Sequence, residues 1–285
     1  MQFLNFKQGS QQGLAVSAGA GFNGLLTTDA NFPGLLDDLL AGGPGALTRA
    51  ADVLRRGPSI DLTKISYLPP VQTPGRIFCI GLNYVDHSVE SGFAVPTYPA
   101  IFSRFASSMI AHGAPIVRPK VSTQLDYEGE LVAIIGKAGR YISKNDALEH
   151  VAGYSICNDA SIRDYQFKSG QWTMGKNFDD SGPFGPVFVT ADSLPPGATG
   201  LKIQTRLNGK VVQDASTASL IFDVATLVHL LSEAVCLQPG DLIVTGTPAG
   251  VGLARKPPLY MKHGDICEVE IEGIGILSNP VVDGP

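Results

Sequence analysis

Asp126-Tyr127-Glu128-Gly129-Glu130-Leu131 leads into the apolar run Val132-Ala133-Ile134-Ile135, which Gly136 ends. A continuous apolar run of this length predicts a strand that is buried on both faces. Glu128 and Glu130 stand at its start. Because strand side chains alternate between faces, both point to the same side, about 6–7 Å apart. Two carboxylates at the mouth of a buried strand repel each other, so they need a cation or shared protons. The competing interpretation is a solvated strand face, since exposed charge is the default.

A third acidic residue favours the cation. Residues 154–158 predict a second short strand, and Asp159 follows at its end. Residues 158–166 then concentrate Asp, Arg and Gln side chains in one short polar segment. A ligand set made only of oxygen atoms favours a hard cation such as Mg²⁺, Mn²⁺ or Ca²⁺.

Four motifs, in their order and spacing, resemble the fumarylacetoacetate hydrolase family. Each is weak alone, but four in register are specific, and the likeness runs from about Ile77 to Val281. The motifs are Asp126-Tyr127-Glu128-Gly129-Glu130-Leu131, Asn158-Asp159-x-Ser161-x-Arg163-Asp164-x-Gln166, Gly175-Lys176-Asn177-Phe178-Asp179 and Gly246-Thr247-Pro248-x-Gly250-Val251-Gly252.

The resemblance implies an α+β, β-rich fold. The expected architecture is a mixed β-roll of the family's C-terminal domain type, with the site in its mouth, preceded by a small α+β domain and assembled as a homodimer. Leu68-Pro69-Pro70-Val71 is typical of an extended linker. We therefore place the variable N-terminal domain at residues 1–70 and the catalytic β-roll at 71–285. Hydrophobic periodicity further predicts helices over residues 32–40, 46–55, 147–151 and 222–235.

The family pattern implies a metal centre. Glu128, Glu130 and Asp159 would hold one divalent ion, Mg²⁺ or else Mn²⁺ or Ca²⁺, and leave coordination positions open for a 2-keto acid. Lys176 would stabilise a developing enolate oxygen as a catalytic residue. Arg104 stands where many family members carry lysine, so its role is open, because guanidinium is a planar fork and ammonium a point charge.

His87 and Glu90 form the candidate base. They stand at i and i+3 of a predicted helical turn, so their side chains share a face. A surface helix with an incidental polar pair is the alternative interpretation. The pattern Asn-Tyr-x-x-His-x-x-Glu instead matches the family's mobile lid, in which His87 would be the general base and Glu90 its orienting carboxylate.

Three further residues are implied in substrate binding. Arg163 and Gln166 would orient the substrate, although Arg163 could instead pair with Asp164 or Asp180. Thr247 follows a glycine, which lets its backbone and hydroxyl approach a small anionic ligand closely.

The implied enzyme is a metal-dependent hydrolase that cleaves a carbon–carbon bond in a 2,4-diketo acid or acylpyruvate. It would release a 2-keto acid such as pyruvate through an enolate. The same residues would serve an oxaloacetate-type decarboxylase, because loss of CO₂ yields a similar enolate, or an isomerase or hydratase acting on an unsaturated 2-keto acid. A metal-binding carrier without activity is the non-enzyme alternative, and it would not need the His87–Glu90 pair.

Composition excludes other classes. The 285 residues are 44% hydrophobic and 16% charged, which suits a sizeable core without long charged tails. A net charge of −5 without a basic cluster argues against a nucleic-acid partner. The four scattered cysteines indicate reduced core residues in a cytoplasmic protein. No signal peptide or membrane-spanning run is expected.

Residues 19–24 fit the glycine pattern of a dinucleotide-binding loop, G-x-G-x-x-G. Such a loop must open a helix, whereas strand and turn residues follow here, so a hairpin turn explains the glycines better. His112, His150 and the pair His229–Glu233 are interpreted as structural.

Overall fold

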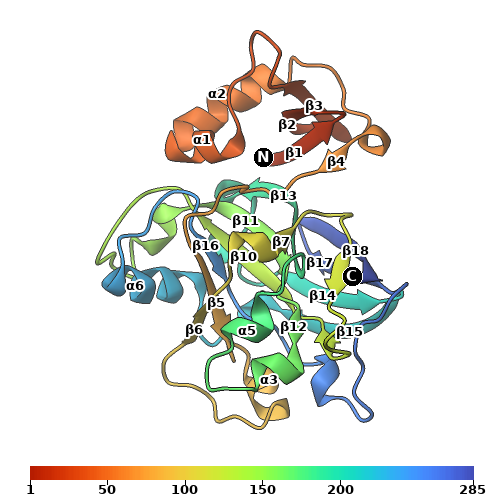
Figure 1. Ribbon diagram of the computed structural model, residues 1–285. Coiled ribbons are helices and arrows are strands. Elements are labelled where there is room, and N and C mark those ends of the chain that lie inside the picture. Colours follow the sequence, from red (N-terminus) through yellow and green to blue (C-terminus); the bar gives the residue numbers. More distant parts are fainter.

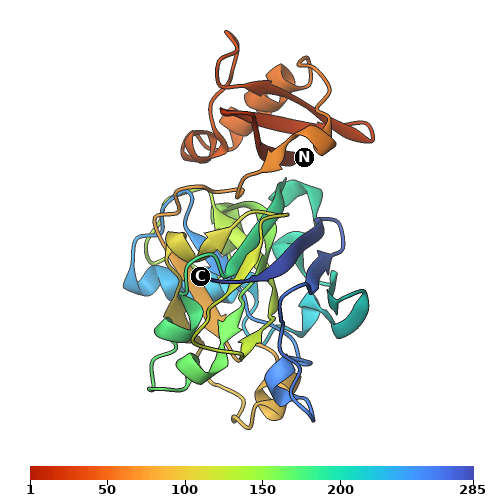
Figure 2. The same ribbon diagram turned by 45° about the vertical axis from the view of Figure 1, so that its right-hand side comes forward.

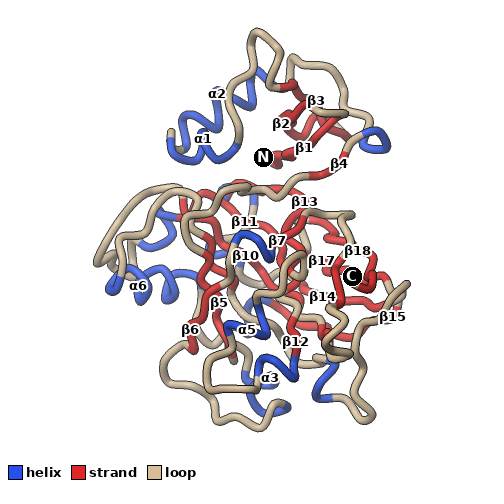
Figure 3. The backbone as a smooth tube through the Cα atoms, in the orientation of Figure 1, coloured by secondary structure: helices blue, strands red, loops and turns tan.

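The computed structural model describes residues 1–285, apart from the side chain of Pro44. Two large β-sheets and a two-stranded one, flanked by short helices, make up the fold (Figure 1, Figure 3). The predicted β-rich α+β class is confirmed. The first seventy residues lie to one side of the larger β-roll in both ribbon views (Figure 2).

The N-terminal part is an antiparallel sheet covered by two helices. Its elements are β1 (Gln2–Gln8), β2 (Gln11–Ala18), β3 (Gly21–Leu26), β4 (Ser66–Tyr67), α1 (Leu36–Ala41) and α2 (Pro44–Leu54). Residues 19–24 form the β2–β3 hairpin, as predicted. The helix expected from residue 32 begins only at Leu36, because Pro33 and Gly34 (φ +115°) interrupt it. β1 also pairs with β13 (Gly182–Thr190), so one sheet runs on into the β-roll, and the domain division near residue 70 stays a prediction.

The large sheet has the strand order β3-β2-β1-β13-β11-β10-β16-β5-β6. Its central strand β10 (Gly129–Ile135) is buried at all seven positions, which confirms the predicted buried strand. The other strands that bear on the site are β11 (Val151–Asn158), β16 (Leu242–Val244), β5 (Ile77–Gly81) and β6 (Ala100–Ser103). Because β10 runs antiparallel to β11 and β16, and β5 runs parallel to β16, the start of β10 meets the ends of the other three at one edge.

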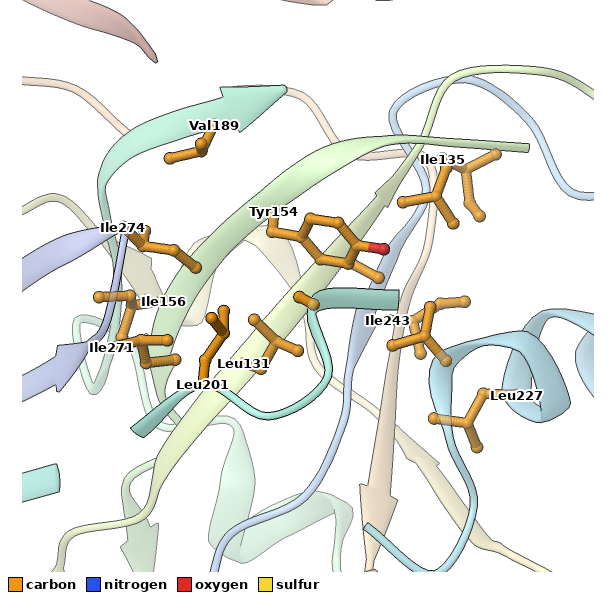
Figure 4. Close-up of a cluster of buried hydrophobic side chains, with 14 of the residues drawn as sticks. Leu131, Ile135, Tyr154, Ile156, Val189, Leu201, Leu227, Ile243, Ile271 and Ile274 are labelled. Carbon is orange, nitrogen blue, oxygen red and sulfur yellow. The ribbon is translucent and has the colours of Figure 1, made fainter. Parts of the chain in front are cut away.

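A second sheet has the order β15-β14-β17-β18-β8 and packs on the first. Its strands are β15 (Lys210–Ser216), β14 (Lys202–Leu207), β17 (Ile266–Ile271), β18 (Gly275–Asp283) and β8 (Ile116–Arg118). Figure 4 shows the shared core, in which Leu131 and Ile156 of the large sheet meet Ile271 and Leu227 comes from helix α6 (Val224–Ala234). The cores of the two sheets and α6 therefore hold the site edge in place.

Short elements complete the chain around that edge. They are α3 (Val85–Glu90), β7 (Met109–Ile110), β9 (Leu125–Asp126), β12 (Ser161–Ile162), α4 (Arg163–Gln166) and α5 (Thr173–Lys176).

Two expectations from the sequence were wrong in detail. Residues 147–150 form a 3-10 turn rather than an α-helix, since β11 begins at Val151. Cys236 is exposed, although Cys79, Cys157 and Cys267 are buried, and all four are free.

Candidate active site

Three carboxylates converge where β10 begins and β11 ends. Glu128 and Glu130 flank Gly129, which lies opposite Asn158 in the β10–β11 ladder, so Asp159 follows directly beside them. One oxygen of each carboxylate lies within 4.8 Å of one oxygen of each of the others, and all three side chains are buried. The interpretation of this pair as a solvated strand face is therefore wrong.

Backbone groups hold the acidic residues in register. Asp159 N donates to the Glu128 carbonyl at 2.8 Å, and Gly246 N donates to Glu130 Oε2 at 2.6 Å. Gly246 has φ +105°, and a Cβ there would lie 2.7 Å from Asn83 Cβ, so this backbone donor can approach only as glycine.

A buried lysine bridges two of the carboxylates. Lys176 Nζ lies 2.5 Å from Glu128 Oε2 and 2.6 Å from Asp159 Oδ2. Burial alone would lower the pKa of Lys176, but Asp159 and Glu128 outweigh it and raise that pKa above its ordinary value. Burial would likewise raise the pKa of Glu128, but Lys176 and Arg163 hold it well below its usual range. The lysine is therefore a fixed cation at neutral pH.

Three cations face four buried carboxylates. Arg163 pairs with Glu128 at 2.6 Å and with Asp126 at 2.8 Å, and not with Asp164 or Asp180. Arg104 Nη1 donates to Asp159 Oδ1 at 2.5 Å. Glu130 has no ion-pair partner among the described side chains. Burial, with Asp159 and Glu128 beside it, raises its pKa well above the usual range.

The donor set fits a divalent metal. It consists only of carboxylate oxygens, which hard cations such as Mg²⁺, Mn²⁺ and Ca²⁺ prefer. One added divalent charge would also offset the carboxylate that lacks a cationic partner. All three acids line a cavity of about 50 Å³, so a ligand in that cavity could reach the same cation.

His87 lines the same cavity, and Glu90 is hydrogen-bonded to it. His87 is buried on α3, lines the cavity, and places Nδ1 3.0 Å from Glu90 Oε1. Gly250 N donates to both Glu90 oxygens, at 3.0 and 2.9 Å, which ties α3 to the loop after β16. The alternative of an incidental surface pair is therefore wrong, while the role of the pair stays a prediction.

The three predicted substrate residues also line the cavity. Arg163 Nη2 is buried and has no hydrogen-bond partner among the described atoms, so it offers a free donor. Gln166 accepts from Arg163 Nη1 at 2.9 Å. The Thr247 hydroxyl donates to the Gly129 carbonyl and accepts from Gln213, so its proton is already used inside the protein.

Sequence reasoning left several residues of this site without a role. Asp126 accepts from Tyr127 N, Gly252 N, Leu253 N and Arg163 Nε, all at 2.8 Å. Its i, i+2 spacing to Glu128 was the signal that could have marked it. Trp172 and Phe102 form an apolar wall of the cavity, and no local pattern indicated them. His112, His150 and His229 lie outside the cavity lining.

Comparison with known proteins now identifies the class. The model of the fumarylacetoacetate (FAA) hydrolase C-terminal domain matches residues 76–282, and the chain belongs to this family. A mitochondrial oxaloacetate tautomerase of Xenopus laevis is 41% identical over 273 residues, covering 95% of this chain and 85% of the relative. A mitochondrial oxaloacetate tautomerase of Homo sapiens is 40% identical, covering 96% of this chain and 88% of the relative.

Solved structures extend the comparison. The fumarylacetoacetate hydrolase of psychrophilic Exiguobacterium antarcticum superimposes with a TM-score of 0.88 at 37% identity over 100% of both chains. The maleylpyruvate hydrolase of Sphingobium sp. SYK-6 gives a TM-score of 0.81 at 28% identity, also over 100% of both chains. The chain is thus an enzyme of a family that acts on small keto acids. Among its described residues, no helix has both the length and the apolar character needed to cross a bilayer.

Proposed function

We propose that this enzyme interconverts the keto and enol forms of a short 2-keto dicarboxylic acid such as oxaloacetate, with a divalent metal as cofactor. The observation that carries the proposal is a buried ammonium, Lys176, beside the three acidic residues in the same cavity as His87. Tautomerisation needs only one mobile proton and a stabilised enolate oxygen. Two relatives that are 40–41% identical, matched over 85% and 88% of their own length, bear the name oxaloacetate tautomerase, which supports this reaction.

Each residue then has a defined task. A divalent cation held by Glu128, Glu130 and Asp159 would, when bound, polarise the 2-keto group. Lys176 places its positive charge near the oxygen on which negative charge develops. Arg163 Nη2, the free buried donor, binds a carboxylate of the substrate.

His87 moves the proton. It takes a proton from C3 of the keto form, the C3–H electron pair becomes the C2–C3 double bond, and the carbonyl π pair moves onto the C2 oxygen. That oxygen takes up a proton from solvent while His87 releases one to solvent, so that no atom is gained or lost. Glu90 holds the Nδ1–H of His87, which leaves Nε2 as the base. In the opposite direction the protonated His87 returns its proton to C3.

The test follows the decay of enol-oxaloacetate by its ultraviolet absorbance with Mg²⁺, against the rate in buffer alone. We expect His87→Gln to lower the catalysed rate by about 10²–10⁴-fold while oxalate binding, measured by calorimetry, persists. His263→Gln is the matched control, because His263 is exposed and does not line the cavity. A wild-type rate equal to the buffer rate would refute the proposal.

Hydrolysis of an acylpyruvate or another 2,4-diketo acid is the second candidate. The His87–Glu90 pair favours it, because a base held by a carboxylate can equally activate water. Pyruvate release from short acylpyruvates, fumarylpyruvate and oxaloacetate distinguishes the reactions. Release with a second organic acid indicates hydrolysis, and release from oxaloacetate with CO₂ indicates decarboxylation.

A further inference from the structure

Part of the cavity wall beside the acidic residues is aromatic. Trp172, the single tryptophan of the chain, and Phe102 both line the cavity. Their ring centroids lie 5.6 Å apart with an interplanar angle of 69°, an edge-to-face contact. Phe102 also lies 5.0 Å from Lys176 Nζ, so this wall directly adjoins the buried ammonium.

A glycine keeps the tryptophan in place. Gly81 ends β5, and a Cβ built there would lie 2.2 Å from Trp172 Cζ3 and 2.8 Å from Cη2. The indole therefore rests directly on the strand backbone, where no side chain could fit. Because the indole contacts both Gly81 and Phe102, it cannot move further toward the sheet.

We propose that Trp172 is the residue that limits the length of the substrate. This inference rests on the proposed keto acid function, because it concerns the part of the acid beyond the 2-keto group. Trp172 lines the same small cavity as the acidic residues, so lengthening an acid that is held at those residues brings its chain against the indole. The cavity of about 50 Å³ is small beside the roughly 300–1,000 Å³ of pockets for drug-sized ligands.

The test measures binding, which does not depend on turnover. Calorimetry with Mg²⁺ present compares oxalate, 2-ketoglutarate and 2-ketoadipate, which is one methylene longer. A rigid wall should penalise an added methylene by about 10–200-fold. We expect Trp172→Ala to narrow the ratio of affinities for 2-ketoglutarate and 2-ketoadipate by tenfold or more, and Trp172→Phe to give an intermediate ratio.

Two further variants keep the test decisive. Gly81→Ala leaves the tryptophan in the chain but must displace its ring, so the ratio should change. Met174→Ala is the matched control, because Met174 is exposed, lies two residues from Trp172 and does not line the cavity. Its ratio should equal that of the wild type. In the wild type and this control, titration with ligand should change the fluorescence of the single tryptophan. The dissociation constant from that titration should equal the one found by calorimetry.

Several outcomes would overturn the inference. The ratio of affinities for 2-ketoglutarate and 2-ketoadipate could be unchanged in both Trp172→Ala and Gly81→Ala, or the tryptophan fluorescence could stay constant when ligand binds. Either result would show that Trp172 does not limit the length of the substrate. Binding of none of the three acids would overturn it together with the proposed function. If the variants change the ratio of affinities but the enzyme does not accelerate tautomerisation, the role of Trp172 stands and the proposed reaction is refuted.

Discussion

Arg104→Met removes the guanidinium that holds one of the candidate metal ligands. Arg104 follows β6 and its side chain is fully buried. It donates to Asp159 Oδ1 at 2.5 Å, to the Ala160 carbonyl at 3.1 Å, and to the hydroxyls of Ser181 at 2.9 Å and Ser108 at 3.2 Å. Methionine has a similar length but offers none of these donors.

The expected loss is large. Removing one partner of a buried ion pair typically costs about 3–5 kcal/mol, because the other charge stays buried. We expect a loss at the lower end of this range, about 3 kcal/mol, because Lys176 still pairs with Asp159 Oδ2. Arg104→Lys keeps the charge but loses the planar guanidinium with its several N–H donors. We therefore expect the free energy of unfolding to fall by about 1–3 kcal/mol.

Urea unfolding followed by circular dichroism measures both losses, once with EDTA and once with Mg²⁺. Mg²⁺ should stabilise each protein that binds it, since a ligand at about 100 times its dissociation constant adds about 2.7 kcal/mol. Arg118→Met is the control, because its pair with Asp283 is half-exposed and worth at most about 1 kcal/mol. If Arg104→Met cost no more than this control in EDTA, the buried ion-pair reasoning would be refuted.

Three other substitutions test the remaining contacts. Glu130→Gln removes a buried carboxylate without a cationic partner, so in EDTA it should raise the free energy of unfolding by about 1–3 kcal/mol. Calorimetry should show weakened Mg²⁺ binding, and a lower stability in EDTA would contradict the reasoning. Asp126→Asn should lower the free energy of urea unfolding by about 3–5 kcal/mol, because one amide oxygen cannot serve four donors that include Arg163; a loss below about 1 kcal/mol would speak against it. Glu90→Gln keeps an acceptor for Gly250 N but loses the charge, so kcat for tautomerisation should fall by less than the roughly 10²–10⁴-fold expected for loss of the base; an unchanged kcat would remove Glu90 from the reaction.

The central strand and the acidic residues were predictable because their signals are local. An apolar run that is continuous rather than alternating indicates burial on both faces, and β10 is buried throughout. The position of Asp159 beside Glu128 and Glu130 needed one more fact, the β10–β11 register, which no pattern in the chain displays. The family resemblance supplied that fact by grouping the three residues in advance.

The contacts that reach across the chain were not predictable. Arg104 and Asp159 are 55 residues apart, and their pairing brings the residue after β6 to the end of β11, although β10, β16 and β5 lie between these strands in the sheet. Periodicity reports which face of an element is buried, but it does not report the partner of a buried charge. The same limit hid Trp172, whose position follows from the missing side chain of Gly81 on a different element.

Hydrogen bonds, with a short stretch of backbone between Gly250 and Gly252, connect α3 to the acidic residues. Glu90 holds His87 and accepts from Gly250 N, and two residues further along the loop Gly252 N donates to Asp126. Asp126 pairs with Arg163, which pairs in turn with Glu128. Since members of one buried network share partners, their free energies do not add. The position of the base and that of the metal ligands are therefore set together. A substitution at one end of this network should shift the side chains at the other end.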